Sequence, residues 1–406
     1  MAESTKYLII GGGVASVSAA KGIRDHDKEG RVLIVSADPL MPYDRPPLSK
    51  NFLSNEAMTH DDVSSKYDHW YDTNKIDVML ATTVKAIDRR NHFAVLTSGD
   101  HIQYEKLLIA TGSRPRQLPG NVTESGSMGH VYRTYADAFA VREKLKTAKN
   151  VVIVGGGFLG PEIASQCATT GHHTTLITQG PHLWEKFAST GLGKFLNEYY
   201  ISHGVHLIAD RKVTAVFEEK VYTSDNQHHP FDLLIAAVGI ELNYELAEEC
   251  GISFLPNDGI QVNEYLQSTA DKDIYAAGDV AFFRDFVMDK QWHLEHHLNA
   301  QWQGAVAGAN MAGANTPYEK VPYFFSDFFD LHMILRGYSP TAEFTAVFGS
   351  FEDAEFIELY ADATGFLKMG ISISREEKKL DPISDKLEEL IKKKVKVSDL
   401  SPADFA

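Results

Sequence analysis

One pattern of residues occurs twice in this chain of 406 residues. In the first copy, the apolar run 7–10 leads into three glycines at 11–13 and a helix expected over 14–24. In the second copy, the apolar run 151–154 leads into three glycines at 155–157 and another expected helix. A strand, a glycine-rich turn and a helix in this order predict a β-α-β unit of the Rossmann type.

The repeat extends beyond the glycines. Strands are expected at 32–35 and 174–178, after the two helices. Further along, 107–112 and 233–239 each have the pattern of a buried strand that ends in a small residue and a glycine, and 273–279 again passes from strand to turn. We therefore expect two duplicated nucleotide-binding domains, one inserted in the other.

The last part of the chain has a different pattern. From about residue 323, short alternating runs such as 344–348 and 356–360 predict an antiparallel sheet, and a closing helix over 384–394 carries charge on most faces. The predicted fold class is α/β, with two Rossmann-like domains and a C-terminal α+β domain that contains an antiparallel sheet.

The glycine motifs indicate nucleotide binding because of where they stand. Gly11-x-Gly13-x-x-Ser16 and Gly155-x-Gly157-x-x-Gly160 both lie between a strand and a helix. The first glycine allows the tight turn, the second lets a pyrophosphate approach the backbone, and the third allows close helix packing. The helix N-terminus then offers N–H groups to the phosphates. Ser16 replaces the third glycine of the first motif, where a small hydroxyl side chain should fit.

Recognition of an adenosine ribose requires an acid near the end of the second strand of each unit. In the first unit Asp38 stands 25 residues beyond Gly13 and is the only candidate. In the second unit the strand ends Thr178-Gln179-Gly180, with neither an acid nor an arginine. Gln179 can bond a ribose hydroxyl but does not repel a 2′-phosphate, so the choice between NADH and NADPH stays open.

Composition excludes several other functions. A formal net charge of −16 argues against general affinity for nucleic acid. The only cysteines, Cys167 and Cys250, form no CxxC or CxxxxC pair, so a redox-active disulfide is not expected, and their small number indicates a reducing, cytoplasmic compartment. No run approaches the ~18 apolar residues of a membrane span. A first strand beginning at Lys6 or Tyr7 leaves no room for a signal peptide.

A longer motif carries a resemblance to a known family. The stretch from Pro42 to Lys50 reads PYDRPPLSK, and it accompanies the two glycine motifs, Ala110-Thr111-Gly112 and the run Ala277-Gly278-Asp279. Together they resemble the glutathione-reductase-type flavoproteins, and within these the ferredoxin reductase and apoptosis-inducing-factor branch. The run Leu294-Glu295-His296-His297 and the later Phe324-Phe325-Ser326-Asp327 look closer to apoptosis-inducing factor.

The resemblance implies four segments: an FAD-binding domain in two parts, 1–117 and 246–323, an NAD(P)-binding domain over 118–245, and a C-terminal domain over 324–406. FAD would lie across the first domain. The implied FAD contacts are Gly11, Gly13, Ser16, Asp38, Arg45, Val84, Ala110, Thr111, Gly112, Arg116, Gly278 and Asp279, with Asp279 on the ribityl chain. The helix N-terminus at Glu295, His296 and His297 would face the flavin N1–C2=O edge, where its dipole favours the anionic reduced ring.

We expect no metal site at His296 and His297. Adjacent histidines on a helix point about 100° apart, and the sequence offers no third or fourth ligand for them.

The resemblance also implies how hydride transfer is arranged. Lys50 would lie beside the reactive face of the flavin, paired with Glu162. Phe325 stands where the family commonly has tryptophan, and Phe158 matches a movable gate residue. NAD(P)H would dock on the remaining implied positions, Gly155, Gly157, Leu159, Gly160, Gln179, Gly239 and Glu241.

The predicted function is an FAD-dependent NAD(P)H oxidoreductase that passes electrons to an external carrier, for which a small iron–sulfur protein such as a ferredoxin or rubredoxin is the leading candidate. Two alternatives stay open: direct reduction of a small acceptor (monodehydroascorbate, a quinone or oxygen), and a redox-responsive interaction protein like apoptosis-inducing factor. The acceptor, the dinucleotide preference and the choice between monomer and homodimer are not readable from the sequence.

Overall fold

The computed structural model describes residues 3–66, 68–118, 129–339 and 341–405. The chain forms two compact units. Unit 1 contains 1–44, 59–114 and 241–320, and unit 2 contains 45–58, 115–240 and 321–406. Strands β7 (Ser113–Pro115) and β16 (Ile240–Leu242) lie where the chain passes from one unit to the other.

Unit 1 contains a mixed sheet in the order β3-β2-β1-β6-β5-β4, with β19 also paired to β6. The contacts among β3, β2, β1, β6 and β19 are parallel, while β5 and β4 extend the sheet antiparallel. The strands are β1 (Glu3–Ile10), β2 (Val32–Val35), β3 (Ile76–Met79), β4 (Val84–Asp88), β5 (Phe93–Leu96), β6 (His101–Ile109) and β19 (Ile274–Ala276).

A smaller sheet and several helices complete unit 1. The sheet has the order β17-β18-β20-β21. Its strands are β17 (Phe254–Leu255), β18 (Gly259–Gln261), β20 (Ala281–Asp285) and β21 (Lys290–Trp292). The helices are α1 (Val14–His26), α3 (Asp68–Thr73), α7 (Glu245–Cys250) and α8 (His297–Met311), with a short 3-10 turn at Asp61–Val63.

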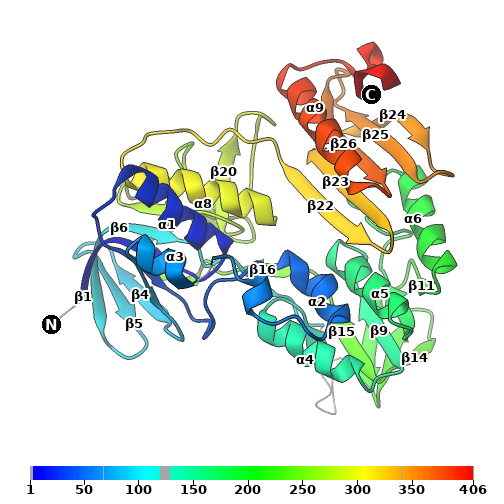
Figure 1. Cartoon of the computed structure of the whole chain (residues 1–406), viewed down its shortest axis with the longest axis horizontal. Helices are drawn as coiled ribbons and strands as arrows, with labels where there is room; N and C mark the ends of the chain where they lie inside the picture. Colours follow the sequence, from blue (N-terminus) through cyan, green and yellow to red (C-terminus); the bar gives the residue numbers. More distant parts are fainter. Residues whose placement is uncertain (1–2, 67, 119–128, 340, 406) are drawn as a thin grey trace. The chain divides into compact units, whose positions relative to one another are not determined.

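Helices α1 and α8 lie side by side in unit 1 (Figure 1). Their backbones approach closely because small residues meet at the crossing. A Cβ atom on Gly304 would lie 2.2 Å from the carbonyl oxygen of Ala15, and one on Gly308 would lie 2.0 Å from that of Ala19. This crossing fixes the N-terminus of α8 relative to the glycine turn that begins α1.

Unit 2 contains a five-stranded parallel sheet in the order β11-β10-β9-β15-β8. The strands are β8 (His130–Val131), β9 (Asn150–Val154), β10 (His173–Ile177), β11 (His206–Ile208) and β15 (Leu233–Ala236). The helices are α2 (Asn51–Ser54), preceded by a 3-10 turn at Pro46–Ser49, α4 (Tyr135–Leu145), α5 (Leu159–Thr169) and α6 (Thr190–Ser202). A three-stranded antiparallel sheet comprises β12 (Val213–Phe217), β13 (Lys220–Thr223) and β14 (His228–Pro230).

The C-terminal part of unit 2 is an antiparallel sheet in the order β22-β23-β26-β25-β24, covered on one face by α9 (Figure 1). The strands are β22 (Tyr323–Phe328), β23 (Leu331–Gly337), β24 (Glu343–Ser350), β25 (Glu355–Ala361) and β26 (Leu367–Ser374). Helix α9 (Leu380–Lys392) is flanked by 3-10 turns at Glu377–Lys379, Val397–Asp399 and Pro402–Phe405.

The predicted fold class is confirmed, and two local expectations are corrected. Strand β1 begins at Glu3 rather than at Lys6 or Tyr7, because its polar first residues pair with β6. Helix α9 begins at Leu380 and has a buried apolar side that includes Leu387 and Leu390, so charge does not cover most of its faces. No helix among the described residues is long and apolar enough to cross a membrane.

Candidate functional site

The predicted site residues are divided between the two units. In unit 1 the glycine turn follows β1. Gly11 has a φ of +128°, and a Cβ there would lie 2.2 Å from the carbonyl oxygen of Ala110, so only glycine fits. A Cβ on Gly13 would meet no atom within 4 Å. The second glycine thus borders open space, as the approach of a pyrophosphate requires.

Ser16 lies in the first turn of α1 and is fully buried. Its Oγ has no hydrogen-bond partner among the described residues, and it lies 3.4 Å from the position of a Cβ on Gly11. A buried hydroxyl without a partner is costly, by about 1–3 kcal/mol. A phosphate oxygen or a water molecule at the glycine turn would satisfy it, so Ser16 fits a pyrophosphate site.

Asp38 follows β2, and its carboxylate accepts hydrogen bonds from the Leu40 N–H at 3.0 Å and from the Tyr43 hydroxyl at 3.0 Å. A carboxylate has about four acceptor positions, so these two bonds leave capacity for a ribose hydroxyl. Val84, at the start of β4, is buried.

The other unit 1 residues cluster around the ends of β6 and β19. The turn Ala110-Thr111-Gly112 is held by Asn243, whose N–H donates to the Gly112 oxygen at 3.0 Å and whose backbone oxygen accepts from the Thr111 hydroxyl at 2.6 Å. Glu241 is half exposed and pairs with Arg114 at 3.2 Å.

Asp279 is buried, and its Oδ2 accepts a hydrogen bond from Ser113 Oγ at 2.6 Å. The N–H of Gly278 donates to Gln303 Oε1 at 2.9 Å. The Nε2 of Gln303 is buried without a partner in the described part of the chain. Gln303 and Ser113 were missed at the sequence level, because only the fold brings them to Gly278 and Asp279.

Helix α8 begins where the sequence predicted. His296 is its N-cap, and the His296 ring nitrogen Nδ1 accepts a hydrogen bond from the Leu298 N–H at 3.3 Å. Glu295 lies 3.1 Å from His293 Nε2. Burial, the largest single influence, lowers the pKa of His293, but the hydrogen bond and charge of Glu295 together with the charges of Asp258 and Asp279 outweigh it, so that pKa is raised.

In unit 2 the second glycine turn repeats the geometry of the first. Gly155 has a φ of +132° and approaches the carbonyl of Ala237, and a Cβ on Gly157 would meet nothing within 4 Å. A Cβ on Gly160 would lie 1.9 Å from the oxygen of Gly155, so the third glycine is required here. Leu159 is the first residue of α5.

Phe158 packs against other aromatic rings. Its ring stacks on Phe187 at a centroid distance of 4.6 Å and on Phe324 at 5.9 Å.

The remaining predicted residues of unit 2 lie in other segments. Arg45 precedes the Pro46–Ser49 turn. The N–H of Arg116 donates to the oxygen of Gly239 at 2.9 Å, so Arg116 lies beside the second dinucleotide fold. Gln179 is exposed, just past the end of β10.

A polar cluster in unit 2 centres on the buried Glu162 carboxylate. Lys50 Nζ lies 2.6 Å from its Oε1, which also accepts from Ser326 Oγ at 2.6 Å. Ser49 Oγ donates to its Oε2 at 2.6 Å. Lys50 Nζ also lies 3.2 Å from Asp327 Oδ2. Lys50 and Glu162 therefore meet, as predicted from the family resemblance.

Two neighbours extend this cluster. The ring of Phe325 lies with its centroid 5.6 Å from Lys50 Nζ, and His332 Nδ1 lies 2.7 Å from Asp327 Oδ1. Ser49, Ser326 and Asp327 received no role at the sequence level, since nothing local indicates that they converge on Glu162.

Among the described residues, no group of three or more His, Cys, Asp or Glu side chains could hold a metal ion.

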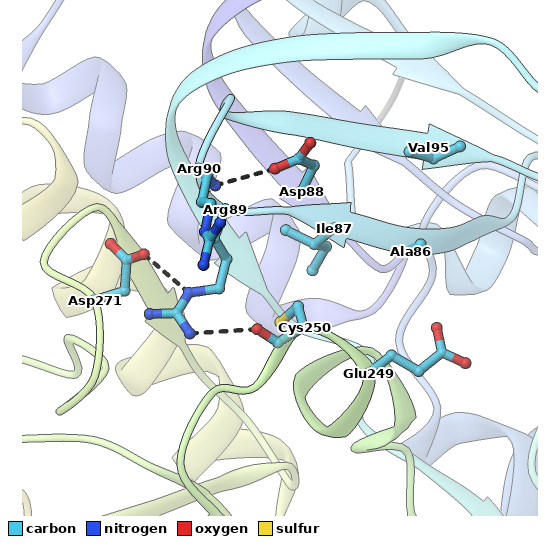
Figure 2. A pocket seen from close by; sticks show the side chains of 9 residues that line it. All are labelled: Ala86, Ile87, Asp88, Arg89, Arg90, Val95, Glu249, Cys250 and Asp271. Carbon is cyan, nitrogen blue, oxygen red and sulfur yellow. Dashed lines mark hydrogen bonds and ion pairs between the residues drawn. The ribbon is translucent and has the colours of Figure 1, made fainter.

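A hollow in unit 1 is lined by none of the predicted site residues (Figure 2). Its lining includes Arg89, Cys250 and Asp271. The Arg89 guanidinium donates to Asp271 Oδ2 at 3.1 Å and to the backbone oxygens of Cys250 at 3.3 Å and Gly251 at 2.8 Å. Arg89 thus holds the loop after β4 against the segment that follows α7, which is a structural role.

Comparisons with known proteins agree with this geometry. Residues 5–304 match the model of the family described as pyridine nucleotide-disulphide oxidoreductase. The chain is 30% identical over 352 residues to the ferredoxin–NAD(+) reductase component of an anthranilate 1,2-dioxygenase system from Burkholderia cepacia, covering 84% of each protein. It is 30% identical over 398 residues to peroxisomal monodehydroascorbate reductase 4 of Arabidopsis thaliana, covering 90% of this chain and 79% of that one.

A solved structure is also similar. The crystal structure of a covalent putidaredoxin reductase–putidaredoxin complex superposes with a TM-score of 0.89 at 28% identity. The match covers 96% of this chain and 93% of the other.

Proposed function

The chain belongs to the pyridine nucleotide-disulphide oxidoreductase family and is an FAD-dependent NAD(P)H oxidoreductase, and from this premise we propose that it delivers electrons from NAD(P)H to a small iron–sulfur protein. The two glycine turns carry the proposal. Each borders open space at its second glycine, so one chain offers a place for FAD in unit 1 and for NAD(P)H in unit 2.

The chain's own residues bind and position the cofactors. We propose that Gly13, Ser16 and Asp38 hold the adenosine diphosphate half of FAD and that Asp279 bonds its ribityl chain. When bound, FAD supplies the redox chemistry by accepting a hydride and passing electrons onward. Glu162 orients Lys50, whose ammonium group favours the negative charge that develops on reduction.

The acceptor is proposed to be external. Cys167 and Cys250 are both free thiols, so neither belongs to a disulfide that could take up the electrons. Several relatives are named for small electron carriers, including a ferredoxin and putidaredoxin, which supports an iron–sulfur protein as the partner. Free thiols are also typical of a reducing compartment, and we propose a cytoplasmic location.

Steady-state kinetics with a panel of acceptors tests this function. The FAD-loaded protein would be assayed with NADH and NADPH against a [2Fe–2S] ferredoxin, a rubredoxin, monodehydroascorbate, a quinone and oxygen. We expect kcat/KM for an iron–sulfur protein to exceed that for the small acceptors by about tenfold or more. A flavin that NAD(P)H reduces rapidly but that passes electrons to neither iron–sulfur protein would overturn the proposal.

Monodehydroascorbate is the second candidate acceptor. The similarity to the Arabidopsis enzyme covers 90% of this chain at the same 30% identity as the bacterial reductase component. A higher kcat/KM for monodehydroascorbate than for both iron–sulfur proteins would assign this function instead.

A further inference from the structure

The two glycine turns can be aligned with each other through the strands that follow them. In unit 1 a Cβ on Gly12 would lie 2.2 Å from the hydroxyl oxygen of Ser36, the first residue after β2. In unit 2 a Cβ on Gly156 would lie 2.2 Å from the hydroxyl oxygen of Thr178, the first residue after β10. Ser36 and Thr178 therefore occupy the same position in the two folds.

The next residues confirm this alignment. The oxygen of Asp38 accepts a hydrogen bond from the Ala81 N–H at 3.1 Å, and the oxygen of Gly180 accepts one from the Asp210 N–H at 2.8 Å. Ala81 and Asp210 share a positive φ, of 49° and 57°. Gly180 in unit 2 thus corresponds to Asp38 in unit 1. The second fold has a glycine where the first has its ribose-binding candidate.

The place of the missing side chain is taken by Glu185. A Cβ on Gly180 would lie 2.2 Å from Glu185 Oε2 and 2.7 Å from its carboxyl carbon. A carboxylate therefore lies beside Gly180, as one does at Asp38 in unit 1. In unit 2 this carboxylate belongs to a residue five positions further along the chain. The side chain is exposed, and within the described ranges it makes no hydrogen bond or ion pair.

The loop that carries Glu185 is fixed to the glycine turn. The Trp184 N–H donates to the Gly156 oxygen at 2.9 Å, and the Leu183 N–H donates to Asn197 Oδ1, on α6, at 3.0 Å. Trp184 is buried. These contacts hold the carboxylate near the end of the second strand, where a Rossmann fold binds the adenosine ribose.

Arg211, which follows the Asp210 N–H that bonds to Gly180, is already paired. Arg211 Nε donates to Asp225 Oδ2 at 2.8 Å, and its Nη1 donates to the Asp210 oxygen at 2.7 Å. This pairing reduces the attraction that Arg211 could offer to a 2′-phosphate. The three heavy atoms nearest to a Cβ on Gly180 all belong to Glu185, so the charge closest to Gly180 is the negative charge of this carboxylate.

We propose that Glu185 is the ribose-binding acid of the second dinucleotide site and makes the enzyme select NADH over NADPH. The carboxylate accepts hydrogen bonds from the 2′- and 3′-hydroxyls of the adenosine ribose and repels a 2′-phosphate. The proposal rests on the proposed binding of NAD(P)H to the glycine turn of unit 2. Glu185 thus decides the preference that Gln179, from its side chain, left open.

Binding and flavin reduction test the proposal together. The FAD-loaded protein would be titrated calorimetrically with ADP-ribose and with 2′-phospho-ADP-ribose, and its anaerobic reduction by NADH and NADPH would be followed by stopped flow. We expect the natural protein to prefer the unphosphorylated ligand and NADH. Glu185→Gln should lower both preferences by about tenfold or more, which corresponds to about 1.4 kcal/mol.

Two further variants make the test specific. Glu198→Gln removes the same charge from an exposed position on α6 and should leave both preferences unchanged. Gly180→Asp combined with Glu185→Ala moves the acid to the position it has in unit 1, and it should restore the preference for NADH. Gly180 does not have a positive φ, so an aspartate can adopt its backbone conformation.

An unchanged preference in Glu185→Gln, with the natural protein still reduced by NADH, would overturn the role of Glu185 and leave the proposed function intact. Failure of the natural protein to bind ADP-ribose or to be reduced by either dinucleotide would instead contradict the proposed function. Equal preferences in Glu185→Ala and in the Gly180→Asp, Glu185→Ala double variant would also overturn the proposal.

Discussion

The Glu162 carboxylate is satisfied by the hydroxyls of Ser49 and Ser326 and by the Lys50 ammonium group. Its buried charge depends on all three donors. Removing one partner of a buried ion pair is more damaging than removing both, because the remaining charge is left uncompensated. Lys50 and Glu162 should therefore act as one unit.

A double-mutant cycle tests this coupling. Lys50→Ala and Glu162→Ala should each slow anaerobic flavin reduction by NAD(P)H by about tenfold or more. The double variant should be much less impaired than the sum of the two losses in ΔΔG‡. Strict additivity would show that Lys50 acts independently of Glu162.

Flavin retention should depend more on Asp279 than on Asp38. Asp279 is buried against Ser113, so its removal leaves a buried group unpaired, at a cost of about 1–3 kcal/mol. Asp38 is only half buried and already binds Leu40 and Tyr43. Asp279→Ala is expected to purify with a lower ratio of flavin to protein absorbance than Asp38→Ala. Full occupancy in both variants would show that the ribityl contact lies elsewhere.

The sequence could predict single residues only where a motif fixes their place. Gly11 and Gly155 were found in this way, and the Lys50–Glu162 pair was implied by the family resemblance. Glu185 was missed because its position depends on a loop that folds back over Gly180, and no local pattern encodes that loop.

At the level of elements, the crossing of α1 and α8 should be sensitive to a single methyl group. Gly304→Ala places a Cβ 2.2 Å from the Ala15 oxygen, which forces the helices apart. We expect a loss of about 1–3 kcal/mol in the free energy of unfolding, measured by urea denaturation, together with weaker flavin retention. Gln301→Ala, at an exposed position of α8, is the control and should cost nothing. Equal stability of the two variants would contradict the tight crossing.

Helix α6 and strand β25 are joined by a buried carboxyl group. Glu358 is fully buried and accepts hydrogen bonds from Ser189, the N-cap of α6, and from the Tyr360 hydroxyl. Burial raises the pKa of Glu358 above its ordinary value of 4.5, although the two hydrogen bonds oppose this. The folded state therefore holds this proton more tightly than the unfolded chain.

Glu358 therefore makes folding less favourable as the pH rises from its ordinary pKa through its raised pKa, because the carboxyl group ionises more readily in the unfolded chain. Glu358→Gln has no ionisable group at this position. The free energy of unfolding of the natural protein, relative to that of Glu358→Gln, should fall as the pH rises above 4.5, through the range in which Glu358 loses its proton. Urea unfolding over this range measures the difference, and a difference that rises or stays constant with pH would contradict the assignment.

Elements with a strong local signal were predicted well, and those that depend on pairing or packing were not. The glycine turns placed α1 and α5 because the turn and the helix start are encoded by adjacent residues. The early start of β1 depends on pairing with β6, which the local sequence does not show. The buried side of α9 does have a local signal, because Leu380, Leu387 and Ile391 recur at helical spacing, and the expectation of charge on most faces overlooked it.

At the level of the whole molecule, segment 45–58 belongs to unit 2 although the sequence around it belongs to unit 1. Arg142 on α4 donates to the backbone oxygens of Phe52 at 3.4 Å, Asn55 at 3.3 Å and Met58 at 2.8 Å. The rings of Phe52 and Tyr135 also pack edge to face at 5.1 Å. These contacts span 80 to 90 residues, so no local pattern around 45–58 indicates that this segment groups with unit 2.

The adenosine half of the flavin cofactor should be essential for stable binding. Gly13, Ser16 and Asp38 lie in the first β-α-β unit, where a Rossmann fold holds a pyrophosphate and an adenosine ribose. FMN lacks both the second phosphate and the adenosine, so it forgoes these contacts. The flavin released on heat denaturation is therefore expected to be FAD, at about one per chain.

The thermal stability of the deflavinated protein also measures how far flavin binding depends on the adenosine half. A ligand that binds only the folded state at 100 times its Kd stabilises that state by about 2.7 kcal/mol. FAD added to the apoprotein should raise Tm and recover NAD(P)H-dependent reduction, while FMN at the same concentration should do neither. Asp38→Ala should weaken the response to FAD and leave the response to FMN unchanged, because only FAD carries the ribose that Asp38 is proposed to bind. An equal rise in Tm with both flavins would show that the first glycine turn does not bind the adenosine diphosphate half.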